Sequence, residues 1–427
     1  MGYTGSIAVI RRPAAAPPGD IATKESISMI ALKRLSAGII ALLLTGVSGA
    51  LAETSVVVDV ATGKVLSQDG ASARWYPAST TKLMTAYLAF RAMDAGAATL
   101  DTPVIMTRDA SRAAPSKMGY EPGSVMRLDN ALRMIMVKSA NDVAVAIGQA
   151  LADGSQERFV AMMNAEARRL GMKDTRFINP NGLPGSGQYS SAKDLAILAV
   201  AIRREFPPFV DFFSTEAITT GEETMRNGND LIGQYAGADG MKTGYICASG
   251  FNVVASATRE GRTLVAVVLG ADGPITRART TAALLENGFK ADLQSVERTV
   301  EQLPVSSGAP ADISEEICSQ EGRTARANER EAESTREAAF GSPYMTELDR
   351  PRVALPVALG GAAGTDTIEA GISVIAAYGI PTPTWRPERM EATSANVAES
   401  VGEGDLRESA ALPERLGETV ETPADAN

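Results

Sequence analysis

Ser79 and Lys82, three positions apart in the stretch PASTTKLM, have a spacing that suits chemistry. A serine hydroxyl is a poor nucleophile at neutral pH and normally depends on an adjacent base, most often a histidine. The chain of 427 residues contains no histidine, which excludes a Ser-His-Asp arrangement. The same absence removes the commonest zinc ligand, two cysteines are too few for a thiolate site, and no loop has calcium-ligand spacing. We therefore expect chemistry without a metal.

Lys82 could itself accept the proton of Ser79. Pro77 and the apolar period of residues 83–90 predict a helix that begins here, so the two side chains would share one face. Burial and a neighbouring cation lower the pKa of a lysine, and the free N–H groups of a helix N-terminus suit a developing oxyanion. The alternative is that Ser79 is an N-cap and Lys82 a solvated first-turn residue. The pair alone favours that alternative, because its spacing is common by chance.

Two further triplets follow in the chain. Ser139-Ala140-Asn141 lies between two helical stretches, and Lys242-Thr243-Gly244 lies in or at the edge of a strand. Each has a purely structural explanation: Ser139 and Asp142 could form a capping box, and Lys242 could be an edge-strand lysine before a glycine bulge. Taken singly, each triplet favours the structural explanation, but their order along the chain favours a shared function.

The set S-x-x-K, S-x-N and K-T-G, in this order, is the signature of penicillin-recognising serine enzymes. The sequence resembles the low-molecular-mass D-alanyl-D-alanine carboxypeptidases of that family over about residues 54–292. The resemblance includes the longer blocks VVVDVATGKVL, RWYPASTTKLMTAY, VKSANDVAVAI, NPNGLPGSGQYSSAKDLA and DGMKTGYICASGFNVVASATREGRTLVAVVLG. Asn181 departs from the family pattern, since many relatives have histidine there, but it lies in no catalytic motif.

The resemblance implies a role for the residues of the first two motifs. Ser79 would be the acylated nucleophile and Lys82 its general base. Ser139 would relay protons to the leaving D-alanine amine and to Lys82, while Asn141 would hydrogen-bond the amide backbone of the substrate.

The third motif would hold the end of the substrate. Lys242 and Thr243 would bind its terminal carboxylate, and Gly244 would let the substrate strand lie close. The backbone N–H groups of Ser79 and Tyr245 would form the oxyanion hole that acyl transfer needs.

Strands and helices must bring these residues together. Residues 54–70 and 251–270 each predict a β-hairpin rich in β-branched residues. Apolar residues at three and four spacing predict helices over residues 79–93, 128–152, 156–171, 191–206 and 276–289. We expect an α/β fold: an antiparallel five-stranded sheet with helices on both faces, plus an all-helical subdomain that carries the second motif. This arrangement, like that of β-lactamases and transpeptidases, would place the active site between sheet and subdomain.

The N-terminus predicts export. Lys33 and Arg34 precede a short apolar run, and Ala50-Leu51-Ala52 is an A-x-A cleavage site, so residues 29–52 are typical of a signal peptide. An uncleaved anchor is the alternative, although the run is short for spanning a bilayer. Residues 1–28 have no fold signal and are either an over-long translation start, with Met29 rather than Met1 as the true start, or a separate extension.

Charge divides the remaining chain into two regions. Residues 53–295 carry 25 acidic and 25 basic residues, whereas residues 296–427 carry 24 acidic residues, 11 Arg and no Lys. The first region is long enough for one substantial core and is the expected catalytic domain. The second has little apolar surface to bury, so we expect it to be largely disordered, with a helix within residues 319–340. Neither region has a basic, aromatic face for nucleic acid.

Cys247 and Cys318 are the only cysteines. In an exported chain we expect them to form a disulfide that ties the acidic region to the third motif, although two free thiols are the alternative. Such a bridge would constrain the unfolded chain and contribute about 4 kcal/mol in the chain-entropy model.

These features predict a periplasmic or secreted serine peptidase that removes the terminal D-Ala from peptidoglycan pentapeptides, uses no cofactor and is inhibited by penicillins. The acidic C-terminal residues would be repelled by anionic lipid, so no membrane anchor is expected after cleavage. A β-lactamase is a rival, but the second motif reads Ser-Ala-Asn rather than Ser-Asp-Asn, and no glutamate lies in a deacylating loop motif. A DD-endopeptidase, or a non-catalytic envelope protein acting through its acidic region, would also fit parts of the sequence.

Overall fold

The computed structural model describes residues 53–336 and 338–363. They belong to one compact unit, Leu51–Asn427. The predicted N-terminal extension and signal peptide, and the acidic residues after 363, lie outside the described residues.

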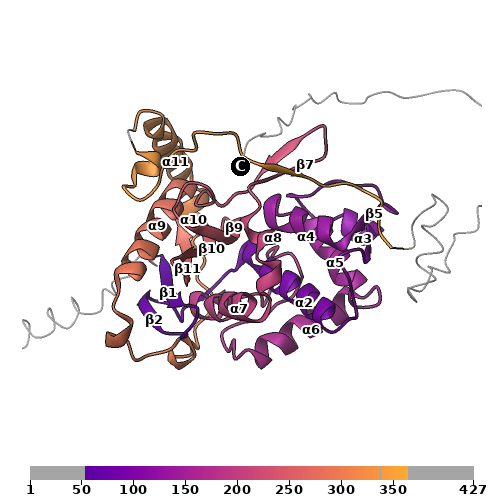
Figure 1. Cartoon of the computed structure of the whole chain (residues 1–427), viewed down its shortest axis with the longest axis horizontal. Coiled ribbons are helices and arrows are strands. Elements are labelled where there is room, and N and C mark those ends of the chain that lie inside the picture. The colour runs from indigo at the N-terminus through magenta and orange to yellow at the C-terminus, as the bar shows by residue number, and fades with distance from the viewer. Residues whose placement is uncertain (1–52, 337, 364–427) are drawn as a thin grey trace, which may run out of the picture. The chain divides into compact units, whose positions relative to one another are not determined.

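A five-stranded antiparallel sheet forms the centre of this unit (Figure 1). It confirms both predicted hairpins, since residues of β1 pair with β2 and residues of β10 pair with β11. Val56, Val57 and Val58 are all fully buried, because helices cover both faces of the sheet. β9 is an edge strand. In spatial order the strands are β2 (Val65–Asp69), β1 (Thr54–Asp59), β11 (Arg262–Ala271), β10 (Gly250–Arg259) and β9 (Ala238–Ile246).

Two long helices cover the two faces, as predicted. α9 (Pro274–Lys290) packs on the face that includes Val57, and α7 (Ala192–Glu205) packs on the opposite face with Val56. Gly288 of α9 allows close contact, because a Cβ there would lie 2.9 Å from Val57 Cγ1.

The remaining large helices form the predicted helical subdomain: α2 (Lys82–Asp94), α4 (Leu128–Val137), α5 (Asn141–Ala150) and α6 (Gln156–Arg169). The predicted helix 128–152 is interrupted at Ser139, whose φ of 62° is left-handed and incompatible with a continuous helix. The subdomain is not purely helical, since it also contains the hairpin of β4 (Pro103–Ile105) and β5 (Val125–Arg127).

Residues 296–336 and 338–363 differ from the expected disorder. They form α10 (Ser314–Cys318), α11 (Gln320–Glu333) and β12 (Ala354–Pro356), and β12 adds in parallel to β7 (Ala217–Thr219). The predicted helix is present as α11. Composition did not predict the other ordered elements of this segment. They are stabilised by contacts with the catalytic region, such as the bidentate ion pair of Arg350 with Glu216, rather than by a core of their own.

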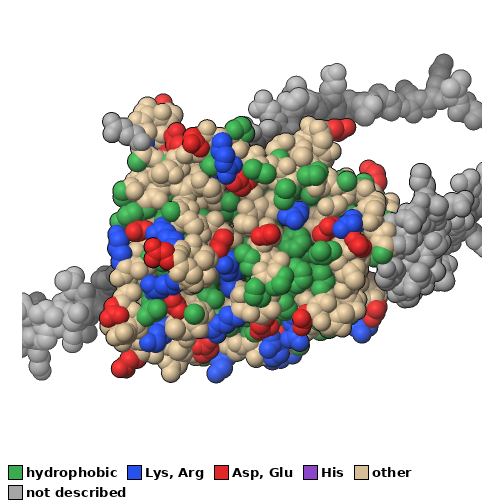
Figure 2. All heavy atoms as spheres, viewed as in Figure 1, with side chains coloured by type: hydrophobic (Ala, Val, Ile, Leu, Met, Phe, Trp, Pro, Cys, Tyr) green, Lys and Arg blue, Asp and Glu red, His purple; other side chains and the backbone are tan. Residues whose placement is uncertain are grey.

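The shorter elements connect these layers. They are β3 (Arg74–Trp75), η1 (Ala78–Thr81), α3 (Arg108–Ser111), β6 (Ser190–Ser191), η2 (Pro207–Phe209), α8 (Asp211–Ser214), β8 (Thr224–Arg226), η3 (Leu293–Ser295), η4 (Val300–Gln302) and η5 (Ala339–Gly341). Within the described ranges, no helix combines the length and apolarity needed to cross a bilayer. Positive and negative side chains are interspersed on the face shown in Figure 2, in line with the balanced charge of residues 53–295.

Candidate active site

Ser79 lies in the 3-10 turn η1, one turn before α2 begins at Lys82. The preceding backbone is fixed to the sheet by Asn252 of β10, which is fully buried. Its Nδ2 donates to the carbonyl of Tyr76 at 2.9 Å, and its Oδ1 accepts from Gly270 N at 3.1 Å. The turn that carries Ser79 is therefore held by the central strands. The N-cap alternative for Ser79 is wrong, because no side chain caps η1 or α2.

Lys82 is fully buried, and three oxygens surround its Nζ. This atom lies 3.0 Å from Ser79 Oγ, 2.6 Å from Asn141 Oδ1 and 2.7 Å from the carbonyl oxygen of Asn181. Nζ donates to all three oxygens. When the amine is neutral, two N–H groups still suffice for Asn141 and Asn181, which leaves the lone pair to face Ser79 Oγ. The solvated first-turn alternative for Lys82 is therefore wrong.

The pKa of Lys82 lies well below its usual value. Burial is the largest cause, because it disfavours the charged amine, and the charge of Lys242 acts in the same direction. Asp142 partly opposes these effects. A lysine shifted in this direction can accept the proton of Ser79 near neutral pH.

Ser139 lies at the break between α4 and α5. Its backbone is left-handed, and its partly exposed hydroxyl makes no hydrogen bond to any described residue. Because α5 has no side-chain cap, the capping-box alternative is wrong. Asn141 is tightly held: its Oδ1 accepts from Lys82, while its Nδ2 donates to the carbonyl of Ala114 at 2.9 Å. One Nδ2 hydrogen remains for a ligand.

Asp142 holds a loop beside Asn141. Its buried carboxylate accepts from the backbone N–H groups of Met118, at 3.1 Å, and Gly119, at 2.9 Å. This contact joins residues far apart in the sequence, and sequence reasoning considered Asp142 only as a helix cap.

β9 brings the third motif against η1. A Cβ at Gly244 would lie 2.8 Å from Ser79 N and 3.0 Å from Thr80 N, so no side chain fits there. Lys242 is only 2% exposed, and the register shift of the β9–β10 pair lies opposite Ser256 rather than at Gly244. Lys242 does lie on an edge strand, but the glycine bulge predicted after it is wrong.

Lys242 has a second cation nearby. The pKa of Lys242 is lowered to about 7, mainly by burial and further by this second cation, Arg277. Arg277 of α9 is also buried and lies 3.3 Å from its partner Asp230. Two buried cations close to partly exposed Thr243 suit a carboxylate ligand. Sequence reasoning missed Arg277, because only the packing of α9 on the sheet brings it to β9.

The spacing and geometry of these motifs agree with a family comparison. A sequence model described as D-alanyl-D-alanine carboxypeptidase, of peptidase family S11, matches residues 47–273. The chain belongs to this carboxypeptidase family.

Two curated D-alanyl-D-alanine carboxypeptidases each share over a third of the aligned residues with this chain. The D-alanyl-D-alanine carboxypeptidase DacD of Escherichia coli strain K12 is 38% identical over 240 residues, covering 55% of this chain and 62% of the relative. DacF of Bacillus subtilis strain 168 is 36% identical over 243 residues, covering 56% and 62%. The chain thus spans less than two thirds of the length of these relatives.

Solved structures of penicillin-binding proteins share the fold. Penicillin-binding protein 6B of Escherichia coli has a TM-score of 0.53 at 37% identity, covering 56% of this chain and 77% of that chain. Penicillin-binding protein D2 of Listeria monocytogenes in its ampicillin-bound form has a TM-score of 0.51 at 29% identity, covering 55% and 96%.

The structure brings one residue of the second motif and two of the third to Ser79 and Lys82. Asn141 accepts a hydrogen bond from Lys82, Gly244 packs on the backbone of Ser79, and the charge of Lys242 lowers the pKa of Lys82. Ser139 adjoins this group through its place in the chain, two residues before Asn141.

The structure also joins Cys247, two residues beyond Tyr245, to Cys318 by a disulfide. Asn181, the departure from the family pattern, contacts Lys82 through its backbone carbonyl. This contact therefore does not depend on which side chain occupies position 181.

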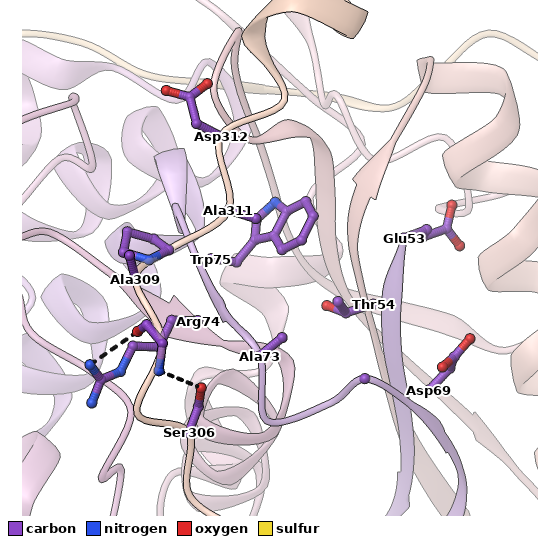
Figure 3. A pocket seen from close by; sticks show the side chains of 13 residues that line it. Glu53, Thr54, Asp69, Ala73, Arg74, Trp75, Ser306, Ala309, Ala311 and Asp312 are labelled. Atoms are coloured by element: carbon purple, nitrogen blue, oxygen red, sulfur yellow. Dashed lines mark hydrogen bonds between the residues drawn. The ribbon is translucent and has the colours of Figure 1, made fainter. Parts of the chain in front are cut away.

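A cavity of about 580 Å³ lies beside β3, and none of the motif residues lines it. Figure 3 shows Glu53 and Asp69 on one side and Ala309 and Asp312 on the other. Burial, with the charges of Asp272 and Asp69, raises the pKa of Glu53 to about 7. Neither Ser79 nor Lys82 lines this cavity.

Proposed function

We propose that this protein is a serine-type DD-carboxypeptidase that removes the terminal D-Ala from peptidoglycan pentapeptide stems. The observation that carries the proposal is the 3.0 Å separation between Ser79 Oγ and the buried Nζ of Lys82, in a chain without histidine. Family membership and the names of the relatives support the choice of substrate. Residues 53–295 are the proposed catalytic domain.

Acylation would start with proton transfer from Ser79 Oγ to Lys82 Nζ. Oγ then attacks the carbonyl carbon of the penultimate D-Ala, and the N–H groups of Ser79 and Tyr245 stabilise the oxyanion. As the C–N bond breaks, the Ser139 hydroxyl donates its proton to the leaving amine, and Lys82 returns its proton to Ser139. One D-alanine leaves, and the remaining peptide is esterified to Ser79.

Deacylation would reuse the same base. Lys82 accepts a proton from water, the hydroxide attacks the ester carbon, and the proton returns to Ser79 as the C–Oγ bond breaks.

Substrate binding would use groups that are still free or charged in this structure. The remaining Nδ2 hydrogen of Asn141 can donate to the amide carbonyl of the stem peptide. Lys242 and Thr243, supported by Arg277, would bind the terminal carboxylate. Penicillins carry a comparable carboxylate and amide, and a relative is known in an ampicillin-bound form, so we propose that they acylate Ser79.

The decisive experiment is mass spectrometry of the products from a defined pentapeptide and from a defined cross-linked dimer, alongside labelling with a fluorescent penicillin. We expect D-alanine release from the pentapeptide, a label on Ser79 that persists for minutes, and loss of both in Ser79→Ala. Rapid loss of label with penicillin turnover would indicate a β-lactamase. Preferential cleavage of the dimer would indicate an endopeptidase, and no label on folded protein would contradict catalysis.

We also propose export to the periplasm with cleavage after Ala52, supported by the A-x-A pattern. The intact mass of protein recovered from a periplasmic fraction should correspond to a chain starting at Glu53. Recovery of the uncut chain in the membrane fraction would contradict the proposal and indicate an anchor.

A further inference from the structure

The C-terminal helices contact the end of the active-site strand. Cys318, the last residue of α10, is joined by the disulfide to Cys247, which follows β9 directly. The backbone N–H of Ile313 donates to the carbonyl of Ala248 at 3.2 Å, in the same turn. Both Ile313 and Cys318 lie outside residues 47–273, the part of the chain matched by the family model.

The side chain of Tyr245 lies between this turn and the sheet. Its ring centroid is 4.3 Å from that of Phe251 on β10. Its Oη lies 3.3 Å from Sγ of Cys318 and 4.0 Å from Sγ of Cys247. Tyr245 is 38% exposed, so these contacts leave part of the residue open to solvent.

Arg326 of α11 lies over the ring of Phe251. Its guanidinium carbon is 5.6 Å from the Phe251 ring centroid. The same guanidinium donates to the carbonyl oxygens of Ile317, at 2.7 Å, and Asp272, at 3.2 Å. Arg326 therefore ties α10, α11 and the end of β11 together around Phe251 and Tyr245.

We propose that residues 313–326, here called the C-terminal bracket, position Tyr245 for acyl transfer. This inference rests on the proposed function, in which the Tyr245 N–H is one of two oxyanion donors. β9 is an edge strand with β10 as its one partner in the sheet, and Tyr245 is its second-last residue, where strands fray. The bracket restrains that end from beyond the family-matched region.

The expected effect is on the rate of acylation rather than on binding. An oxyanion donor has to lie within about 2.7–3.1 Å of the developing charge, and a misplacement of about 1 Å costs about 100-fold in rate. Lys242, the proposed carboxylate site, lies in the middle of β9 and is buried, so it does not depend on the bracket. Tyr245 is the residue through which the bracket acts.

The test compares the oxidised and the reduced forms of the same full-length protein. We expect reduction to lower kcat for a pentapeptide and the acylation rate by fluorescent penicillin about 10-fold, with KM changed less than about 2-fold. A Cys247→Ser/Cys318→Ser double variant should match the reduced protein and no longer respond to reductant. Equal rates for both forms would overturn the inference.

Two further measurements separate this inference from the proposed function. Hydrogen exchange at the amide of Ile246, which follows Tyr245 and donates to Ser249 Oγ at 3.1 Å, should be faster in the reduced form, whether or not the protein hydrolyses peptides. Equal exchange would refute the bracket, whereas absence of acylation in the oxidised form would refute the proposed function. Arg326→Gln should also lower kcat. Arg330 is an exposed arginine on the same helix, and Arg330→Gln should leave kcat unchanged. Equal kcat for both arginine variants would also count against the bracket.

Discussion

Gly244 of β9 packs directly on the backbone of Ser79, so that a Cβ at Gly244 would lie 2.8 Å from Ser79 N. The backbone of Gly244 is not left-handed, so glycine is needed for the close approach and not for a special conformation. The proposed nucleophile and the strand proposed to bind the substrate therefore meet backbone to backbone.

Gly244→Ala should lower the rate of acylation by penicillin about 100-fold or more, because β9 or η1 must move to admit the methyl group. Stopped-flow labelling measures the rate, and circular dichroism checks the fold. Gly308→Ala is the matched control, since its nearest contact would be an ordinary 3.7 Å from Ser306 Oγ. An undiminished rate in Gly244→Ala would refute the close approach.

Lys82→Ala should lower acylation about 10²–10⁴-fold, because a general base is worth about that much and no histidine can replace it. Lys242→Ala should mainly raise KM for substrates with a free carboxylate. Steady-state kinetics with a pentapeptide and its C-terminal amide distinguish the two effects. Penicillin acylation of Lys82→Ala at the wild-type rate would show that another group is the base.

The pH profile of kcat/KM should be bell-shaped, since it reports the free enzyme. The rate rises with pH as Lys82 loses its proton at its lowered pKa, and it falls above about pH 7 as Lys242 loses the charge that binds carboxylate. The alkaline fall should be absent for a peptide with a C-terminal amide. Identical profiles for acid and amide would contradict the role of Lys242.

Lys242→Met should stabilise the protein while impairing substrate binding. The pKa of Lys242 is about 7 in the folded protein and higher in the unfolded chain. Below pH 7 the lysine is charged in both states, so the folded protein carries the whole free-energy cost of a buried charge. As pH rises from 7 toward 10, the folded state loses the proton first and this cost becomes smaller. We expect a gain of about 1–4 kcal/mol in the free energy of unfolding at pH 6, shrinking by pH 9.5. Urea unfolding at both pH values measures it. The exposed Lys290→Met serves as control, and a loss of stability in Lys242→Met at pH 6 would contradict the argument.

Asn252→Ala should slow acylation about 10-fold or more, because it frees the carbonyl of Tyr76 just before the catalytic turn. It should also cost about 1–3 kcal/mol of stability, since buried polar groups lose their partners. Asn164→Ala removes a comparable amide that donates to Val160 and Phe177 carbonyls away from the site. Equal acylation rates per folded molecule in the two variants would show that Asn252 contributes to stability and does not position the turn that carries Ser79.

Local sequence determined the parts of this protein that depend on neighbouring residues. The hairpins at residues 54–70 and 251–270, the helices and the S-x-x-K pair are encoded within a few positions, so periodicity and spacing were sufficient. The order of the three motifs indicated the family, and the absence of histidine favoured Lys82 as the base.

Tertiary structure decided what depends on distant segments. Asn252 donates to the carbonyl of Tyr76 just before the turn that carries Ser79, and no local pattern indicates this. Asp142 and Arg277 influence the pKa of Lys82 and Lys242 only once the chain has folded. The bracket at residues 313–326 has a composition typical of disorder and is ordered through its contacts with Cys247, Phe251 and the end of β11. Composition reports only what a segment could bury by itself, whereas these residues gain their stability and their roles from surfaces supplied by the rest of the fold.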